Sequence, residues 1–156
     1  MKNLFCTAIV SVLLVLCAAA DGQEFFEGKR ICGRIEIIIA AVSGEKTLSA
    51  VLYDNSSARA LLEKLAGGGI TLNMNDYGGF EKVADLGFSL PQNDTPTDTD
   101  AGDLILYLGR RFVIYYDKNS WNFTPLGKIE AVSKSELQSI LGDGSVRVTI
   151  RKQEPR

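Results

Sequence analysis

One segment, Ala101–Ile129, constrains the fold of this chain more than any other. It contains two apolar runs, Leu104–Leu108 and Phe112–Tyr116, which are joined by a Gly-Arg-Arg tripeptide. Two short β-prone runs separated by a few residues that include glycine are typical of a β-hairpin. An aromatic-rich stretch follows and closes on the triplet GKI. The segment therefore predicts antiparallel strands that carry an unusual concentration of aromatic side chains.

The first twenty residues have the pattern of a secretory signal peptide. A lysine precedes an apolar run, Leu4–Leu16, and Ala18–Ala20 provides the small residues that a signal peptidase requires. The apolar run is too short to be a comfortable membrane span. We therefore expect cleavage near Ala20 and a protein that is exported, periplasmic or secreted. A lipoprotein signal acylated at Cys17 is the alternative, although a bulky leucine stands where a small residue usually precedes such a cysteine.

The rest of the chain has the size of one domain. Residues 21–30 are polar and lack periodicity, so we expect a leader segment followed by a single domain over residues 31–152. The full chain has 17 basic and 19 acidic residues and no basic tract. A mildly acidic domain is a poor partner for nucleic acid or for an anionic membrane surface. We expect no nucleic-acid partner and no membrane span in the mature chain, and the sequence leaves the oligomeric state open.

The side chains that carry most nucleophilic and metal chemistry are scarce. The chain has no histidine, and Cys32 is the single cysteine after the signal. These counts exclude Ser–His and Cys–His pairs, His-based metal sites and a thiolate zinc site. In the acidic stretch Asp94–Asp103, Asp98 and Asp100 are spaced as in a calcium loop, but Gly109 stands where the closing carboxylate is needed. We expect a solvated loop, with no metal and no cofactor.

The remaining segments alternate between short β-prone runs and two short helical patterns. An apolar stripe from Ala58 to Leu65 predicts a helix capped by Asp54 or Asn55, and Ser133–Leu141 begins with a capping-box spacing. A long polar loop is expected over Gly87–Asp103. Further strands are expected at residues 31–42, 47–53, 70–74, 80–86 and 146–150. Many short strands without a βαβ rhythm predict a mainly-β barrel or sandwich with helices at its ends.

Several motifs occur together in order: VLYDNSSARALLEKL, NMNDYGGFEKVADL, AGDL-x-LY, G-x-x-FVIYY and WNFTPLGKI. In this pattern, from about Ile35 to Ile150, the chain resembles the family of small bacterial cyclophilin-like domains. The resemblance implies a closed cyclophilin-like β-barrel whose ends are capped by short helices. It implies little about activity, because a fold does not carry its function with it.

The chain departs from the true prolyl isomerases that share this fold. Those enzymes place an arginine beside a hydrophobic proline pocket lined by Phe, Gln, Trp and His. This chain has no histidine and no counterpart of the isomerase signatures FHR and FMxQGGDF. Isomerisation needs no nucleophile, only electrostatic stabilisation of a twisted amide, so a divergent peptidyl-prolyl isomerase stays an alternative. We name no catalytic residue.

The candidate ligand-binding residues are aromatic and charged side chains of the resembling motifs. Trp121 and Phe123 lie in a polar, turn-rich segment, and exposed rings near a barrel mouth are common anchors for peptides and small ligands. The other candidates are Tyr116, Arg111, Glu81 and Lys128. The alternative interpretation is that most rings are core, that the arginines form a solvated turn, and that the charges in these motifs, including Lys82, are surface charges.

Together these observations favour a non-catalytic binding module for a peptide or small molecule at the barrel mouth. The first alternative is the divergent isomerase. The second is a structural accessory of an envelope complex.

Overall fold

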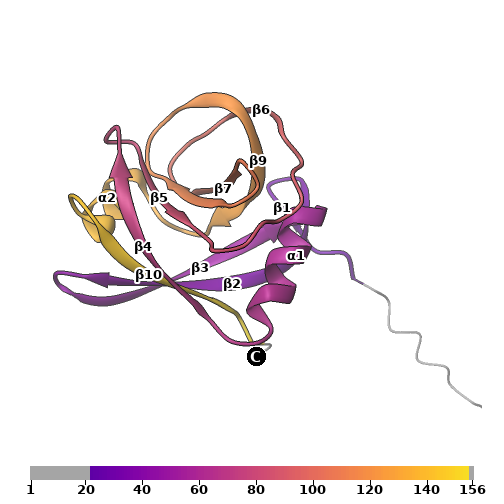
Figure 1. Ribbon diagram of the computed structural model, residues 1–156, viewed down its shortest axis with the longest axis horizontal. Helices are drawn as coiled ribbons and strands as arrows, with labels where there is room; N and C mark the ends of the chain where they lie inside the picture. Colours follow the sequence, from indigo (N-terminus) through magenta and orange to yellow (C-terminus); the bar gives the residue numbers. More distant parts are fainter. Residues whose placement is uncertain (1–21, 155–156) are drawn as a thin grey trace, which may run out of the picture.

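The computed structural model describes residues 22–154, which form mainly β-structure (Figure 1). The predicted signal peptide and the alternative acylation site at Cys17 lie outside the described residues. No helix within residues 22–154 is long and apolar enough to cross a membrane.

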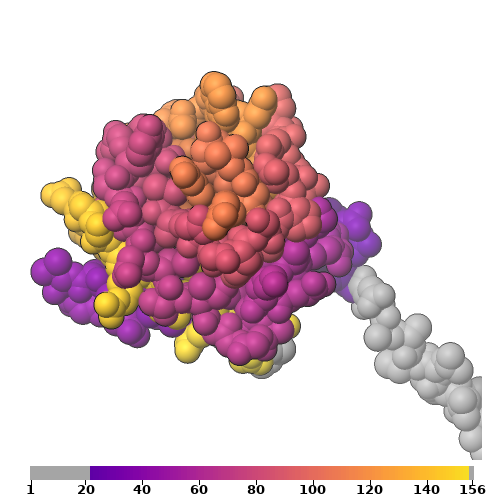
Figure 2. Space-filling view, in the orientation of Figure 1, coloured from indigo at the N-terminus to yellow at the C-terminus, as the bar shows by residue number. Residues whose placement is uncertain are grey.

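Eight antiparallel strands close into a barrel. Their order is β2, β10, β4, β5, β8, β7, β9 and β3, and β3 pairs back onto β2. Their bounds are Lys29–Ala41 for β2, Gly44–Tyr53 for β3, Ile70–Tyr77 for β4, Glu81–Asp85 for β5, Asp103–Tyr107 for β7, Arg111–Tyr115 for β8, Ser120–Ile129 for β9 and Val146–Lys152 for β10. The tip of the β2–β3 hairpin projects from the body of the molecule (Figure 2). The predicted mainly-β fold with a closed barrel is confirmed.

Two short strands lie where the sequence predicts irregular structure. β1 (Phe25–Phe26) pairs with the start of β2, so part of the expected leader is ordered against the barrel. β6 (Thr95–Asp98) lies in the predicted polar loop and pairs with the first half of β9. Neither segment has the apolar alternation of a strand. Each is extended because a longer neighbouring strand offers it a row of backbone hydrogen-bonding groups.

The two predicted helices cap the barrel ends, on opposite sides of the strands in Figure 1. α1 (Ser56–Leu65) begins at Asn55, whose side chain accepts a hydrogen bond from a backbone N–H of the first turn at 2.9 Å. α2 (Lys134–Leu141) begins at Ser133, which makes the same kind of bond at 3.2 Å. A side-chain oxygen at this position satisfies a helix N–H that has no partner within the helix. Both caps are residues that the sequence indicates.

The main core fills the barrel and follows from strand alternation. Ile35, Ile37 and Ile39 of β2 point inward and are fully buried, as are Phe112 and Ile114 of β8. Successive side chains of a strand point to opposite faces, so the residues between them face outward. On β5 and β8 the outward side chains Val83, Val113 and Tyr115 contribute to a second, smaller cluster outside the barrel.

One charged side chain, Lys82 of β5, is buried among the described residues with no exposed surface. Its ammonium donates hydrogen bonds to Asp76 Oδ1 at 3.0 Å and to the Gly144 carbonyl at 2.7 Å. The hydroxyl of Tyr116 donates to the same Asp76 oxygen. The interpretation of Lys82 as a surface charge is therefore wrong. The even-numbered residues of β5 face the barrel interior. Lys82 is tolerated there because its charge is paired and hydrogen-bonded.

Candidate functional site

The candidate site is a pocket on the outer wall of the barrel, on the face of β5 and β8 opposite the main core. Glu81 pairs across the strands with Tyr115, and Val83 pairs with Val113. These side chains form the floor of the pocket, and their neighbours in sequence point into the barrel. The sequence predicts a ligand at the barrel mouth. The structure instead places an aromatic-lined cavity on the barrel wall.

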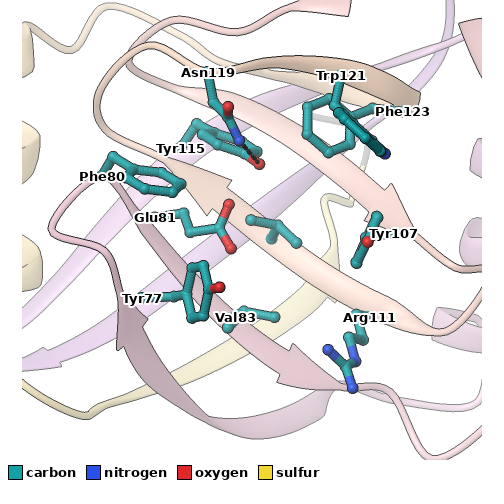
Figure 3. A pocket seen from close by; sticks show the side chains of 11 residues that line it. Tyr77, Phe80, Glu81, Val83, Tyr107, Arg111, Tyr115, Asn119, Trp121 and Phe123 are labelled. Carbon is teal, nitrogen blue, oxygen red and sulfur yellow. Dashed lines mark hydrogen bonds between the residues drawn. The ribbon is translucent and has the colours of Figure 1, made fainter.

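Aromatic rings surround this floor in a continuous series (Figure 3). The ring of Phe80 stacks on that of Tyr115, with centroids 6.2 Å apart and an interplanar angle of 11°. Tyr77 meets the edge of Phe80 at 6.0 Å. Phe123 lies 5.6 Å from Tyr115 and 6.0 Å from Tyr107. Such offset and edge-to-face contacts are favourable, so the neighbouring rings support one another.

Trp121 forms part of the rim. It lies on the first half of β9, opposite Thr97 of β6, so the short β6 strand supports the segment that presents it. Its side chain is 64% exposed although it borders the cavity, and Tyr77 across the pocket is 63% exposed. The enclosed volume is about 310 Å³, which is at the small end of the range for ligand sites. We call this cavity the aromatic pocket.

Glu81 places a carboxylate in the middle of the aromatic pocket (Figure 3). Asn119 donates a hydrogen bond to the Tyr115 hydroxyl at 3.3 Å. Burial raises the pKa of Glu81, the Tyr115 hydrogen bond opposes this, and the charge of Asp76 adds to it. No lysine or arginine among residues 22–154 forms an ion pair with Glu81.

Arg111 lies at the other end of the aromatic pocket. It is four residues from Tyr115 along β8, a separation of about 13 Å in an extended strand. The neighbouring Arg110 pairs with Asp85, Nε to Oδ2 at 2.8 Å. Arg111 makes no ion pair with any other described residue. The cavity therefore combines an apolar floor with one unpaired carboxylate and one unpaired guanidinium.

The structure brings together four of the six predicted site residues: Trp121, Phe123, Arg111 and Glu81. Tyr116 lies inside the barrel, with its hydroxyl on Asp76, because it occupies the inner face of the strand end that carries Tyr115.

Lys128 is also outside the aromatic pocket. It lies near the other end of β9 and pairs with Asp103 at 2.9 Å.

Sequence reasoning missed part of the lining. The residues that it did not single out as ligand contacts are Tyr77, Phe80, Val83, Tyr107, Val113, Tyr115 and Asn119. The period of two identifies two faces on each strand, but β8 carries aromatic residues on both faces and β5 carries charged residues on both faces, so neither strand shows which face is core. The sequence feature that could have identified the pocket is the pair of charged residues, Glu81 and Arg111, on the same face of the two strands.

Residues 22–154 do not contain a cluster of side chains suited to binding a metal ion. This part of the chain has no group of three or more Cys, Asp or Glu residues arranged to hold an ion.

Comparisons with known proteins agree on the fold. Residues 41–151 match a family model described as the Cyclophilin-like family. Among solved structures, the solution structure of a hypothetical protein from Archaeoglobus fulgidus aligns with a TM-score of 0.54 and 17% sequence identity, covering 83% of this chain and 100% of that chain. At this identity the likeness concerns the fold alone. A comparison with functionally curated proteins finds no match.

Proposed function

The chain belongs to the cyclophilin-like family, and from this premise we propose that it is an exported, non-catalytic binding module whose aromatic pocket takes a short peptide segment or a small ligand. The observation that supports this proposal is the large exposed ring of Trp121 at the rim of a cavity lined by mutually packed aromatic side chains. Exposed rings beside a concave, mostly apolar surface are the usual anchors of ligand sites. Export rests on the signal-like N-terminus.

Replacing Trp121 by alanine is expected to weaken ligand binding at least tenfold and to leave stability within about 0.5 kcal/mol of the wild type, because the side chain is 64% exposed. The probes are a library of short peptides and small fragments, and binding of each probe is followed by changes in the amide chemical shifts of the protein. Trp121 is the single tryptophan of the chain, so its fluorescence reports on the pocket rim in the wild-type protein.

The matched control is Phe25→Ala, which removes another exposed ring, 58% exposed, from outside the aromatic pocket. This variant should bind as the wild type does. If no library member perturbs the pocket, or if Trp121→Ala binds every probe as tightly as the wild type, the proposed function fails. Phe123 is unsuited to this test because it is 4% exposed and belongs to the cluster outside the barrel, so its loss would also destabilise the fold.

A divergent prolyl isomerase is the second candidate, and the position of Arg111 favours it. The guanidinium lies at the end of an apolar pocket, which is the combination that isomerases with this fold use. The Glu81 carboxylate opposes this function, since a negative charge inside the pocket disfavours charge developing on a substrate carbonyl. A protease-coupled assay on proline tetrapeptides tests the candidate. A rate that equals the uncatalysed rate excludes it for those substrates.

A further inference from the structure

The Glu81 carboxylate is a charge without a counter-charge in the aromatic pocket. It is half-buried, it lies among rings, and no basic side chain of the described residues pairs with it. The neighbouring Tyr115 hydroxyl lowers the pKa of Glu81 against the effect of burial, and a carboxylate has several acceptor positions, so Glu81 can accept further hydrogen bonds from a ligand. Because a partly desolvated carboxylate is costly without a counter-charge, the site is complementary to a cation.

The rings around Glu81 strengthen this preference. Tyr77, Phe80 and Tyr115 lie around the carboxylate in Figure 3, and Trp121 and Phe123 close the opposite side of the cavity. The faces of aromatic rings carry negative electrostatic potential, so they attract ammonium groups within about 6 Å, and most strongly where water is excluded. A carboxylate within a set of aromatic rings therefore favours a cationic amine over a neutral group of the same size.

At the other end of the cavity, Arg111 favours an anionic group. The guanidinium makes no ion pair among the described residues, because its cross-strand neighbour Asp85 is paired with Arg110. Planar guanidinium groups bind carboxylates with two parallel hydrogen bonds. Between the two charges the floor is formed by Val83 and Val113, which offer no hydrogen bond from their side chains.

We propose that the aromatic pocket binds a zwitterion: an ammonium group held by Glu81 and the surrounding rings, an aliphatic middle over Val83 and Val113, and a carboxylate at Arg111. This inference rests on the proposed function and names the ligand chemistry of the same site. An uncharged prolyl segment leaves both protein charges unpaired, and a ligand with a single charge leaves one of them unpaired.

The test compares four probes of similar length on the purified protein: ε-aminocaproate, which carries an ammonium and a carboxylate at its two ends, hexylamine, hexanoate and hexanol. Dissociation constants come from Trp121 fluorescence and amide chemical shifts. We expect ε-aminocaproate to bind most tightly and hexanol most weakly, with at least a tenfold difference between them. The order follows from the two charged contacts. The contact with Glu81 is strengthened because this carboxylate is half-buried, whereas Arg111 is exposed and contributes less.

Two variants separate the two contacts. Glu81→Gln keeps the shape and should weaken hexylamine and ε-aminocaproate at least tenfold while leaving hexanoate unweakened. Arg111→Gln should weaken hexanoate and ε-aminocaproate at least threefold and spare hexylamine. Glu63→Gln and Arg147→Gln remove the same charges from exposed positions outside the aromatic pocket and should change nothing. Thermal unfolding of each variant checks that the fold is intact.

The outcomes separate this inference from the proposed function. If hexanol binds as tightly as hexylamine, or if Glu81→Gln leaves hexylamine binding unchanged, the ammonium assignment is overturned while the pocket keeps its binding role. If Arg111→Gln leaves hexanoate binding unchanged, the carboxylate assignment is overturned. If neither these probes nor any peptide or fragment perturbs the aromatic pocket, both the inference and the proposed function fail.

Discussion

Replacing Lys82 by methionine is expected to lower the free energy of unfolding by about 3 kcal/mol, because breaking a buried ion pair from one side leaves its partners unsatisfied. The lysine is fully buried, and its ammonium joins Asp76 of β4 to the Gly144 carbonyl in the turn after α2. Methionine retains most of the aliphatic volume, so the loss reports on the charge and its hydrogen bonds. Urea denaturation at neutral pH measures it.

Two further variants make this prediction specific. Lys46→Met changes an exposed lysine of the β2–β3 hairpin and should be neutral within about 0.5 kcal/mol. Asp76→Asn combined with Lys82→Met should cost less than the sum of the two single changes, because the two groups belong to one network. Equal stability of Lys82→Met and the wild type would show that the buried ammonium contributes nothing to closing this end of the barrel.

The hydrogen-bonded network of Lys82, Asp76 and Tyr116 also makes the free energy of unfolding depend on pH in acid. Burial raises the pKa of Asp76, but the hydrogen bonds from Tyr116 and Lys82 outweigh it, so the pKa in the folded protein lies below the ordinary value of 3.8. A depressed carboxyl pKa contributes stability that is complete above the ordinary value and is lost as the pH falls through the folded-state value. Without Lys82 the folded-state pKa rises. The difference in stability between the wild type and Lys82→Met should therefore be largest well above pH 3.8 and should narrow as the pH falls through 3.8 towards the lower folded-state pKa of Asp76.

Local rules accounted well for the regular elements of this chain. The apolar stripe and the caps at Asn55 and Ser133 place both helices, and the Gly-Arg-Arg connection places the β7–β8 hairpin. These features depend on neighbours in sequence, so one sequence suffices to see them. The strand β6 could not be found this way. Its Thr-Pro-Thr-Asp sequence is turn-like, and only its pairing with β9 makes it extended.

The site was predictable only in part, because a period of two cannot say which face of a strand is inside. On β8 both faces are aromatic, so Tyr115 and Tyr116 are equivalent in sequence. The closed barrel then puts Tyr115 in the aromatic pocket and Tyr116 on Asp76. Lys82 shows the same limit. A lysine is normally exposed, and its burial here depends on Asp76 in the adjacent strand β4 and on the carbonyl of Gly144, which is 62 residues away in the sequence.

Replacing Gly127 by alanine is expected to destabilise the protein by about 3 kcal/mol or more, because overpacking against backbone cannot be relieved by rotating a side chain. A Cβ at this position would lie 1.9 Å from the Val51 carbonyl oxygen and 3.1 Å from the Leu52 Cα. Gly127 lies on β9, paired with Leu52 of β3, and the β3–β9 pairing spans residues 50–52 of β3. This short pairing completes the barrel, so a local separation of the strands opens its wall.

Thermal unfolding of Gly127→Ala should show Tm lowered by about 10 °C. The control is Gly67→Ala, at a site with nothing within 4 Å of the added Cβ, and it should leave Tm unchanged. A Gly127→Ala protein that unfolds within 2 °C of the wild type would mean that the glycine of the GKI triplet is dispensable for closing the barrel.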